Sequence, residues 1–179
     1  MSIVILISCI LRLRRPVGWT ELILSAWWKH GRIMATYSHK VHLRYTAAQL
    51  FDLVADVERY PEFMPWTITT RVRRRTNRVI WTDLTIGTGI FRKRFSTVAT
   101  LDRPHRIAIT SHDPLFERFE QKWTFEDSTE GGTDVEYYTE FQFRSFLLQA
   151  LIDLSFVDRA DAIVSAYTHR ARRLYGVPS

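Results

Sequence analysis

Residues with the chemistry for catalysis or metal binding are scattered in this sequence. The chain has six histidines, and none has the spacing of a metal-binding motif such as HExxH. It also contains no GxSxG motif, phosphate-binding loop or dinucleotide-binding fingerprint. Asp83 and Glu140 could act as a general base, but the alternation of the residues around them points both side chains outward. We therefore expect no enzyme activity, no metal site and no required cofactor.

Arginines are concentrated in one short stretch, at the end of a predicted strand and in the turn that follows it. This basic patch consists of Arg71, Arg73, Arg74, Arg75 and Arg78. It could be an ordinary solvated face, or it could dock on anionic lipid headgroups or on RNA phosphates. Arg92 and Arg94 on a neighbouring predicted strand could extend it. The sequence leaves these three interpretations open.

Length and composition indicate one globular domain with a short addition. The chain has 179 residues, of which 46% are hydrophobic and 25% charged, and domains usually contain about 100–150 residues. Cys9 is the single cysteine, which excludes a disulfide scaffold and a zinc site built on paired thiolates. This cysteine usage weakly favours a reducing compartment.

The addition is at the N-terminus. Residues 1–33 carry five Lys/Arg and one acidic residue, whereas residues 34–179 carry 20 and 18. The apolar run 3–11 is too short to cross a bilayer, and its positive charges follow it, unlike those of a secretory signal. We interpret residues 1–33 as an upstream extension, or alternatively as a targeting or membrane-contact leader, and residues 34–179 as the folded domain. Met1 and Met34 are both candidate start residues.

Hydrophobic periodicity defines the elements of the folded domain. Alternation predicts a strand over residues 37–45 and six more strands between Ile68 and Phe143, linked by short turns. Thr46 is a good N-cap for a helix after the first strand, and prolines end the helical segment that follows. Helical spacing then predicts a helix of nearly thirty residues from Ser145 to a stop at Gly176. The fold class is therefore α+β, with a curved antiparallel sheet of about seven strands wrapped round a long C-terminal helix.

Four segments of this domain carry a resemblance to a known family: residues 50–66, 91–107, 115–127 and 145–176. They resemble the coenzyme Q-binding START-like proteins, a group within the START and polyketide cyclase superfamily that includes the bacterial ribosome association toxin. The resemblance implies the helix-grip fold. It also implies a non-catalytic protein that binds ubiquinone and supports quinone biosynthesis or delivery to the respiratory chain.

The apolar strand faces predict a cavity between the sheet and the helix that suits an apolar ligand such as a prenyl chain. We expect its lining to consist of apolar residues of the sheet, two polar residues that could bond a quinone carbonyl, and apolar residues of the helix. These are Leu84, Ile86, Phe95, Ile107, Ile109, Phe119, Trp123, Phe141 and Phe143, then Gln121 and Thr139, then Leu147, Leu151 and Leu154. Each could instead be a plain core residue.

Phe63 and Trp66 belong to a stretch with two prolines, which could be a rigid turn or an exposed lip at the cavity mouth that contacts a membrane. The expected partners are ubiquinone or another prenyl lipid, a membrane surface, and respiratory or quinone-synthesis enzymes. The expected location is the cytoplasmic side of the inner membrane in bacteria or the matrix side of the mitochondrial inner membrane in eukaryotes. Two alternative functions are a translation regulator that binds the large ribosomal subunit and a polyketide cyclase or aromatase.

Overall fold

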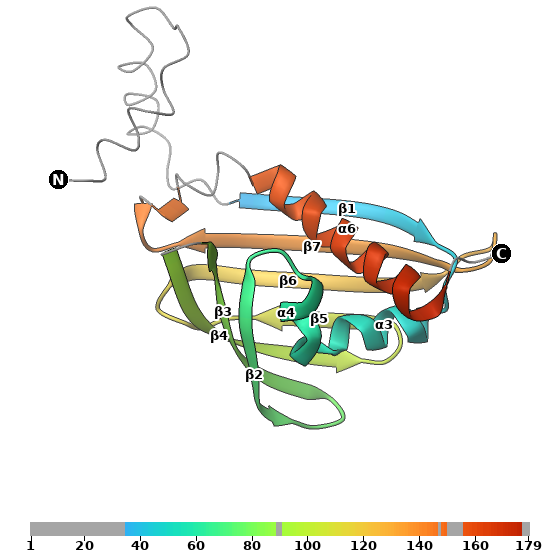
Figure 1. Cartoon of the computed structure of the whole chain (residues 1–179), viewed down its shortest axis with the longest axis horizontal. Helices are drawn as coiled ribbons and strands as arrows, with labels where there is room; N and C mark the ends of the chain where they lie inside the picture. The colour runs from blue at the N-terminus through green and yellow to red at the C-terminus, as the bar shows by residue number, and fades with distance from the viewer. Residues whose placement is uncertain (1–34, 89–90, 147, 150–155, 177–179) are drawn as a thin grey trace, which may run out of the picture. The chain divides into compact units, whose positions relative to one another are not determined.

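The computed structural model describes residues 35–88, 91–146, 148–149 and 156–176 (Figure 1). The described residues form seven strands, three helices and one 3-10 helix, η1. In chain order these are β1 (Ala35–Leu43), α3 (Ala47–Ala55), η1 (Val57–Arg59), α4 (Tyr60–Phe63), β2 (Thr67–Arg75), β3 (Val79–Thr88), β4 (Phe91–Asp102), β5 (Arg106–Thr110), β6 (Phe116–Asp127), β7 (Thr133–Phe143) and α6 (Phe156–Tyr175). The predicted order of elements is confirmed.

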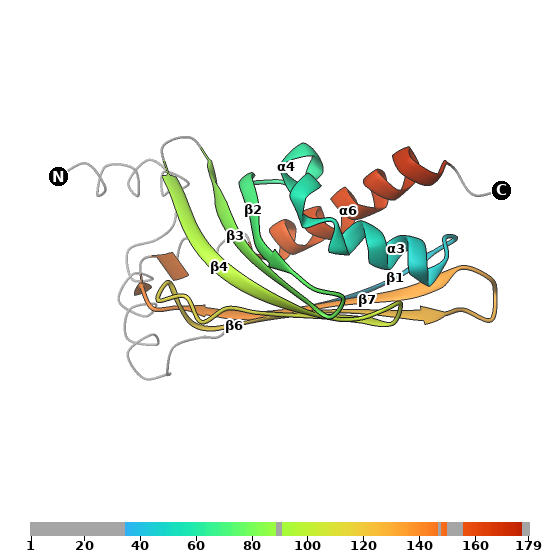
Figure 2. The same cartoon turned by 90° about the horizontal axis from the view of Figure 1, so that it is seen from below.

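The strands form one antiparallel sheet in the order β1-β7-β6-β5-β4-β3-β2. The first strand therefore lies beside the last, and β2 forms the opposite edge. Figure 2 shows that the sheet is strongly bent and that α3, α4 and α6 all lie on its concave side. The predicted α+β class, with a curved seven-stranded sheet around a C-terminal helix, is confirmed.

Helix α3 begins where the sequence predicts. The Thr46 side chain accepts a hydrogen bond from the Gln49 amide at 3.2 Å, and the Gln49 side chain accepts one from the Thr46 amide at 3.0 Å. This capping box satisfies donors that the first turn of a helix otherwise leaves free. The helix buries Leu50, Phe51 and Val54 against the sheet.

Helix α6 ends at the predicted glycine. Gly176 has a φ of +81°, and its amide donates to the Arg172 carbonyl at 3.0 Å, as expected for a residue that terminates a helix in the left-handed region. Ser145 caps the helical turn after β7, since its hydroxyl accepts from the Leu148 amide at 3.4 Å. The interpretation of residues 1–33 as a leader, and the continuity of the predicted helix between residues 150 and 155, lie outside the described residues.

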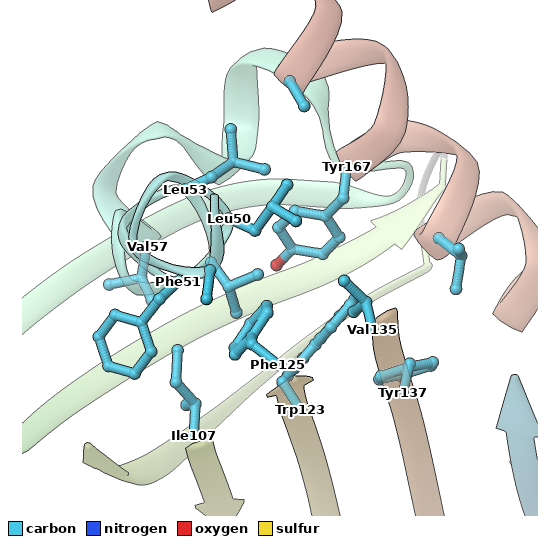
Figure 3. Packing of buried hydrophobic residues seen from close by; sticks show 14 of the residues in the cluster. Leu50, Phe51, Leu53, Val57, Ile107, Trp123, Phe125, Val135, Tyr137 and Tyr167 are labelled. Carbon is cyan, nitrogen blue, oxygen red and sulfur yellow. The ribbon is translucent and has the colours of Figure 1, made fainter. Parts of the chain in front are cut away.

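The main hydrophobic core lies between the sheet and the helices (Figure 3). The Phe51 ring of α3 meets the Phe125 ring of β6 edge to face at 5.9 Å. Tyr167 of α6 meets Trp123 of β6 in the same geometry at 4.8 Å. Aromatic pairs of this kind add to the gain from burial, so both helices are anchored on the same strand, β6.

Candidate functional site

The strand register brings the predicted lining residues of the sheet onto one face. Leu84 of β3 lies opposite Phe95 of β4, and Gln121 of β6 lies between Ile109 of β5 and Thr139 of β7. Side chains two residues apart on a strand share a face. All eleven sheet residues in the predicted lining therefore point toward the concave side, which the helices cover in Figure 2.

Within that face, the lining residues divide between two clusters. Ile107 and Trp123 belong to the main core beneath α3 and α6, and Ile107 is only 1% exposed. Phe95, Phe141 and Phe143 belong to a second, aromatic cluster, together with Phe116 and the partly buried Ile86 and Phe119. Leu84 packs against both clusters. The predicted helix residues Leu147, Leu151 and Leu154 lie outside the described residues.

Between the two clusters lies a polar group that includes both predicted polar residues. Gln121 donates from Nε2 to the hydroxyl of Tyr137 at 3.2 Å, and Thr139 is the next inward residue on the Tyr137 strand. Burial raises the pKa of Tyr137, so its phenol stays protonated. Alternation along β7 predicts that Tyr137 faces inward, but nothing in the sequence distinguishes it from the other inward residues.

The two predicted lip residues occupy different positions. Phe63 is partly buried, and its ring meets Tyr167 at 5.4 Å, with the Arg170 guanidinium stacked over it. Trp66 has a φ of +62°, and its carbonyl accepts from the Gly87 amide at 2.9 Å. This segment therefore joins α4 to β2 and packs on α6. Contact with a membrane here stays a prediction.

The basic patch does not form one continuous face. Arg73 pairs with Asp83 at 3.1 Å, Arg74 stacks over the Trp81 ring, and Arg75 instead pairs with Glu58 at 3.2 Å. The strand register shifts between Val72 and Arg74. Because of this shift, the side chains of Arg73 and Arg75 point in different directions. Arg71 lies opposite Asp83 and, like Arg78, is exposed.

The two candidate acids both lie on the convex side of the sheet and are engaged in charge pairs there. Asp83 pairs with Arg94 at 2.8 Å and accepts from the Ser96 hydroxyl at 2.7 Å, which lowers the pKa of Asp83. Glu140 pairs with Arg118 and accepts from the Tyr138 hydroxyl at 2.5 Å. Both carboxylates are therefore separated from the concave face by the sheet itself. In the described part of the chain, no three histidine, cysteine or acidic residues form a group that could hold a metal ion.

A hollow of about 460 Å³ lies away from the predicted lining. It is formed by α3, η1, α4, β2 and the end of α6, and six of its residues are charged: Asp52, Asp56, Glu58, Arg59, Arg75 and Arg170. A prenyl chain would desolvate these charges without pairing them. This hollow could not be predicted from the sequence because its walls come from elements that are far apart in the chain.

Polar contacts at both ends hold α6 over the concave face. Near its first turns, Asp161 accepts a hydrogen bond from Tyr37 of β1. At its other end, the Tyr45 hydroxyl donates to the Gly176 carbonyl at 2.7 Å and the Tyr175 hydroxyl donates to the Gln49 carbonyl at 3.1 Å. The helix thus closes the concave face from the β1 edge to α3.

A bent antiparallel sheet that grips a C-terminal helix over an apolar face defines a helix-grip protein. Residues 43–168 match the family model described as polyketide cyclase / dehydrase and lipid transport. The chain belongs to this family, and its resemblance to START-like proteins is confirmed.

Three similar proteins illustrate the range of the family. The ribosome association toxin RatA of Pseudomonas aeruginosa is 31% identical, over 75% of this chain and 93% of the relative. The mitochondrial coenzyme Q-binding protein COQ10 homolog B of Xenopus laevis is 27% identical, over 78% of this chain and 59% of the relative. The crystal structure of the ZhuI aromatase/cyclase from Streptomyces sp. R1128 has a TM-score of 0.69 at 17% identity, covering 81% of this chain and 100% of the other. The last likeness concerns the fold alone.

Two findings bear on activity and location. RatA and COQ10 homolog B are named for association and binding, whereas the similar folds include aromatase/cyclases. None of the helices in the described ranges combines the length and hydropathy that a membrane span requires.

Proposed function

We propose that the protein binds a prenylated lipid, ubiquinone or a close analogue, on the concave face of the sheet beneath α6. The observation that carries this proposal is a set of inward-facing apolar residues that stay partly exposed: Leu84, Ile86, Ile109 and Phe119. Other inward residues, such as Ile80 and Phe125, are almost completely buried. The partly exposed set marks where the face remains accessible to a ligand.

The hydrophobic effect is sufficient to drive this binding. Each CH2 group of a prenyl tail removed from water contributes about 0.8 kcal/mol. The partly exposed Leu84, Ile86 and Phe119, which pack on the aromatic cluster, offer apolar contacts for such a tail. A protein of this kind would carry a quinone to respiratory enzymes or present it to quinone-synthesis enzymes, from a position peripheral to the inner membrane. The name of the COQ10 relative agrees with this ligand class.

Lipid extraction from the purified full chain tests the proposal. Mass spectrometry of the organic extract should detect a prenyl quinone. Leu84→Trp fills the accessible part of the face and should abolish its recovery. Val98→Trp introduces the same side chain on the convex side, since Val98 lies opposite Trp81, and should retain the lipid. Absence of lipid from the wild-type protein, together with no binding of added short-chain ubiquinone, would contradict the proposal.

A second candidate function is association with the ribosome. Two observations favour it: the relationship to RatA and the presence of four arginines on the convex side, Arg71, Arg73, Arg74 and Arg94, of which Arg73 and Arg94 pair with Asp83. RNA binding that depends on arginine contacts weakens steeply as salt rises. Co-sedimentation with the large ribosomal subunit at low salt should then disappear at high salt and in an Arg71→Glu, Arg74→Glu variant. Persistence of co-sedimentation in that variant would exclude the convex face as the site.

A further inference from the structure

The polar group on the concave face lies at a chemical boundary. Along β6 the inward residues run Phe119, Gln121, Trp123, and along β7 they run Phe141, Thr139, Tyr137, with each opposite its counterpart. Phe119 and Phe141 belong to the aromatic cluster, whereas Trp123 and Tyr137 belong to the main core. A ligand tail on the aromatic cluster would therefore meet these polar atoms before it reached the closed core.

Two of these polar side chains have hydrogen-bonding capacity that the described residues do not use. Tyr137 is 1% exposed; its oxygen accepts from Gln121 at 3.2 Å, and its hydroxyl also lies within reach of the Thr139 hydroxyl. Thr139 is 2% exposed, and its hydroxyl makes no hydrogen bond of normal geometry with any described residue. Buried polar groups almost always have partners. Even if one of these two hydroxyls donates to the other, the second proton has no acceptor among the described residues.

Two other buried hydroxyls, those of Tyr60 and Thr133, each have a backbone acceptor. The Tyr60 hydroxyl donates to the Val54 carbonyl at 2.6 Å. At the far end of β7, the Thr133 hydroxyl donates to the Tyr45 carbonyl at 2.7 Å, and Thr133 is fully buried. Tyr60 and Thr133 thus differ from Tyr137 and Thr139, because each of the first two hydroxyls has a backbone carbonyl as its acceptor.

We infer that Tyr137, Thr139 and Gln121 form a headgroup subsite that binds a hydrogen-bond acceptor, such as the carbonyl or ether oxygen of a quinone. This inference rests on the proposed function and specifies the orientation of the lipid. The acceptor receives the Tyr137 and Thr139 protons, Gln121 holds the phenol in place, and the tail extends over the aromatic cluster. The subsite selects prenyl lipids with an oxygenated head over prenyl hydrocarbons.

Binding of two matched probes tests this subsite on the full chain. The probes are a short-chain ubiquinone and a prenyl hydrocarbon of similar length without oxygen. Trp123 lies 4.5 Å from Tyr137 between ring centroids, so a quinone in the subsite should quench its fluorescence, with Trp123→Phe as the assignment control. The wild-type protein should bind the quinone more tightly than the hydrocarbon.

Removal of single hydroxyls should change this selectivity. Thr139→Val and Tyr137→Phe should each weaken quinone binding about five-fold, the value of one typical hydrogen bond, and leave hydrocarbon binding unchanged. Thr133→Val is the matched control, because it makes the same change on the same strand at a satisfied hydroxyl. It should lower the melting temperature without changing selectivity, whereas Thr139→Val should not lower the melting temperature.

The outcomes separate the subsite from the proposed function. Equal wild-type affinities for the two probes, or variants with unchanged quinone affinity, would overturn the subsite and leave lipid binding intact. Failure of the wild-type protein to bind either probe would overturn the proposed function and the subsite together.

Discussion

Asp83 of β3 pairs with Arg94 of β4 at 2.8 Å across the convex face, although the aspartate side chain is only 10% exposed. The same carboxylate binds Arg73 of β2 and the Ser96 hydroxyl. These contacts connect three neighbouring strands through one anion. Charge-assisted hydrogen bonds with little solvent access are stronger than neutral ones, so this network stabilises the β2 edge of the sheet.

Acid should weaken this network. The Ser96 hydrogen bond and the two arginines lower the pKa of Asp83 in the folded state. The resulting stability is present above the ordinary aspartate pKa and is lost as the pH falls through the lowered value. Asp83→Asn should reduce the free energy of unfolding at neutral pH by about 1–2 kcal/mol. In the variant, the free energy of unfolding should also fall less steeply as the pH is lowered.

Urea unfolding between acid and neutral pH measures this effect. Glu58→Gln is the control, since Glu58 also pairs with an arginine, Arg75, but its side chain is 60% exposed. Exposed ion pairs contribute little. If the two variants had the same pH dependence as the wild-type protein, the Asp83 network would have no role in stability.

Adjacent glycines in the β6–β7 turn should respond very differently to alanine. Gly131 and Gly132 have φ values of +82° and +83°, which cost a residue with a side chain about 1 kcal/mol. A Cβ at Gly132 would lie 2.5 Å from the Leu43 carbonyl oxygen, whereas a Cβ at Gly131 would meet nothing within 4 Å. Gly132→Ala should therefore lower the melting temperature considerably more than Gly131→Ala. Similar losses in thermal unfolding would show that backbone conformation alone requires these glycines.

Truncation of the core should be costly at the contact between α3 and β6. Phe125 is 1% exposed and packs edge to face on Phe51. Phe125→Ala should decrease the free energy of unfolding by about 3–5 kcal/mol. Leu174→Ala, at a residue that is 51% exposed, should change it far less. Chemical denaturation of both variants checks the difference, and a loss below about 1 kcal/mol for Phe125→Ala would contradict the packing described here.

The fold could be predicted from the sequence because its main signals are local. Strand alternation, the Thr46 cap and the Gly176 stop depend on residues close together in the chain, and the structure has each of them. Alternation also predicted that the side chains of Asp83 and Glu140 point outward, to the convex side of the sheet.

The candidate site was less accessible to sequence reasoning because it depends on contacts between distant segments. Alternation placed Leu84 and Phe119 on the inner face, but it could not show which inward residues remain partly exposed. The basic patch was predicted as one run, yet a register shift in β2 turns Arg75 toward Glu58 and away from Arg73. Alternation makes Tyr137 one of many inward residues, and only the fold brings its hydroxyl to the Gln121 amide.

Ligand binding should raise the thermal stability of the protein. A ligand that binds only the folded state at one hundred times its Kd stabilises that state by about 2.7 kcal/mol, which corresponds to roughly 5–10 °C for a domain of this size. Differential scanning fluorimetry with short-chain ubiquinone should show a concentration-dependent rise for the wild-type protein and for Val98→Trp. Leu84→Trp should show none, because its indole occupies the accessible part of the concave face. An equal rise for Leu84→Trp would place the ligand elsewhere, and the hollow between α3 and the end of α6 would become the first position to test.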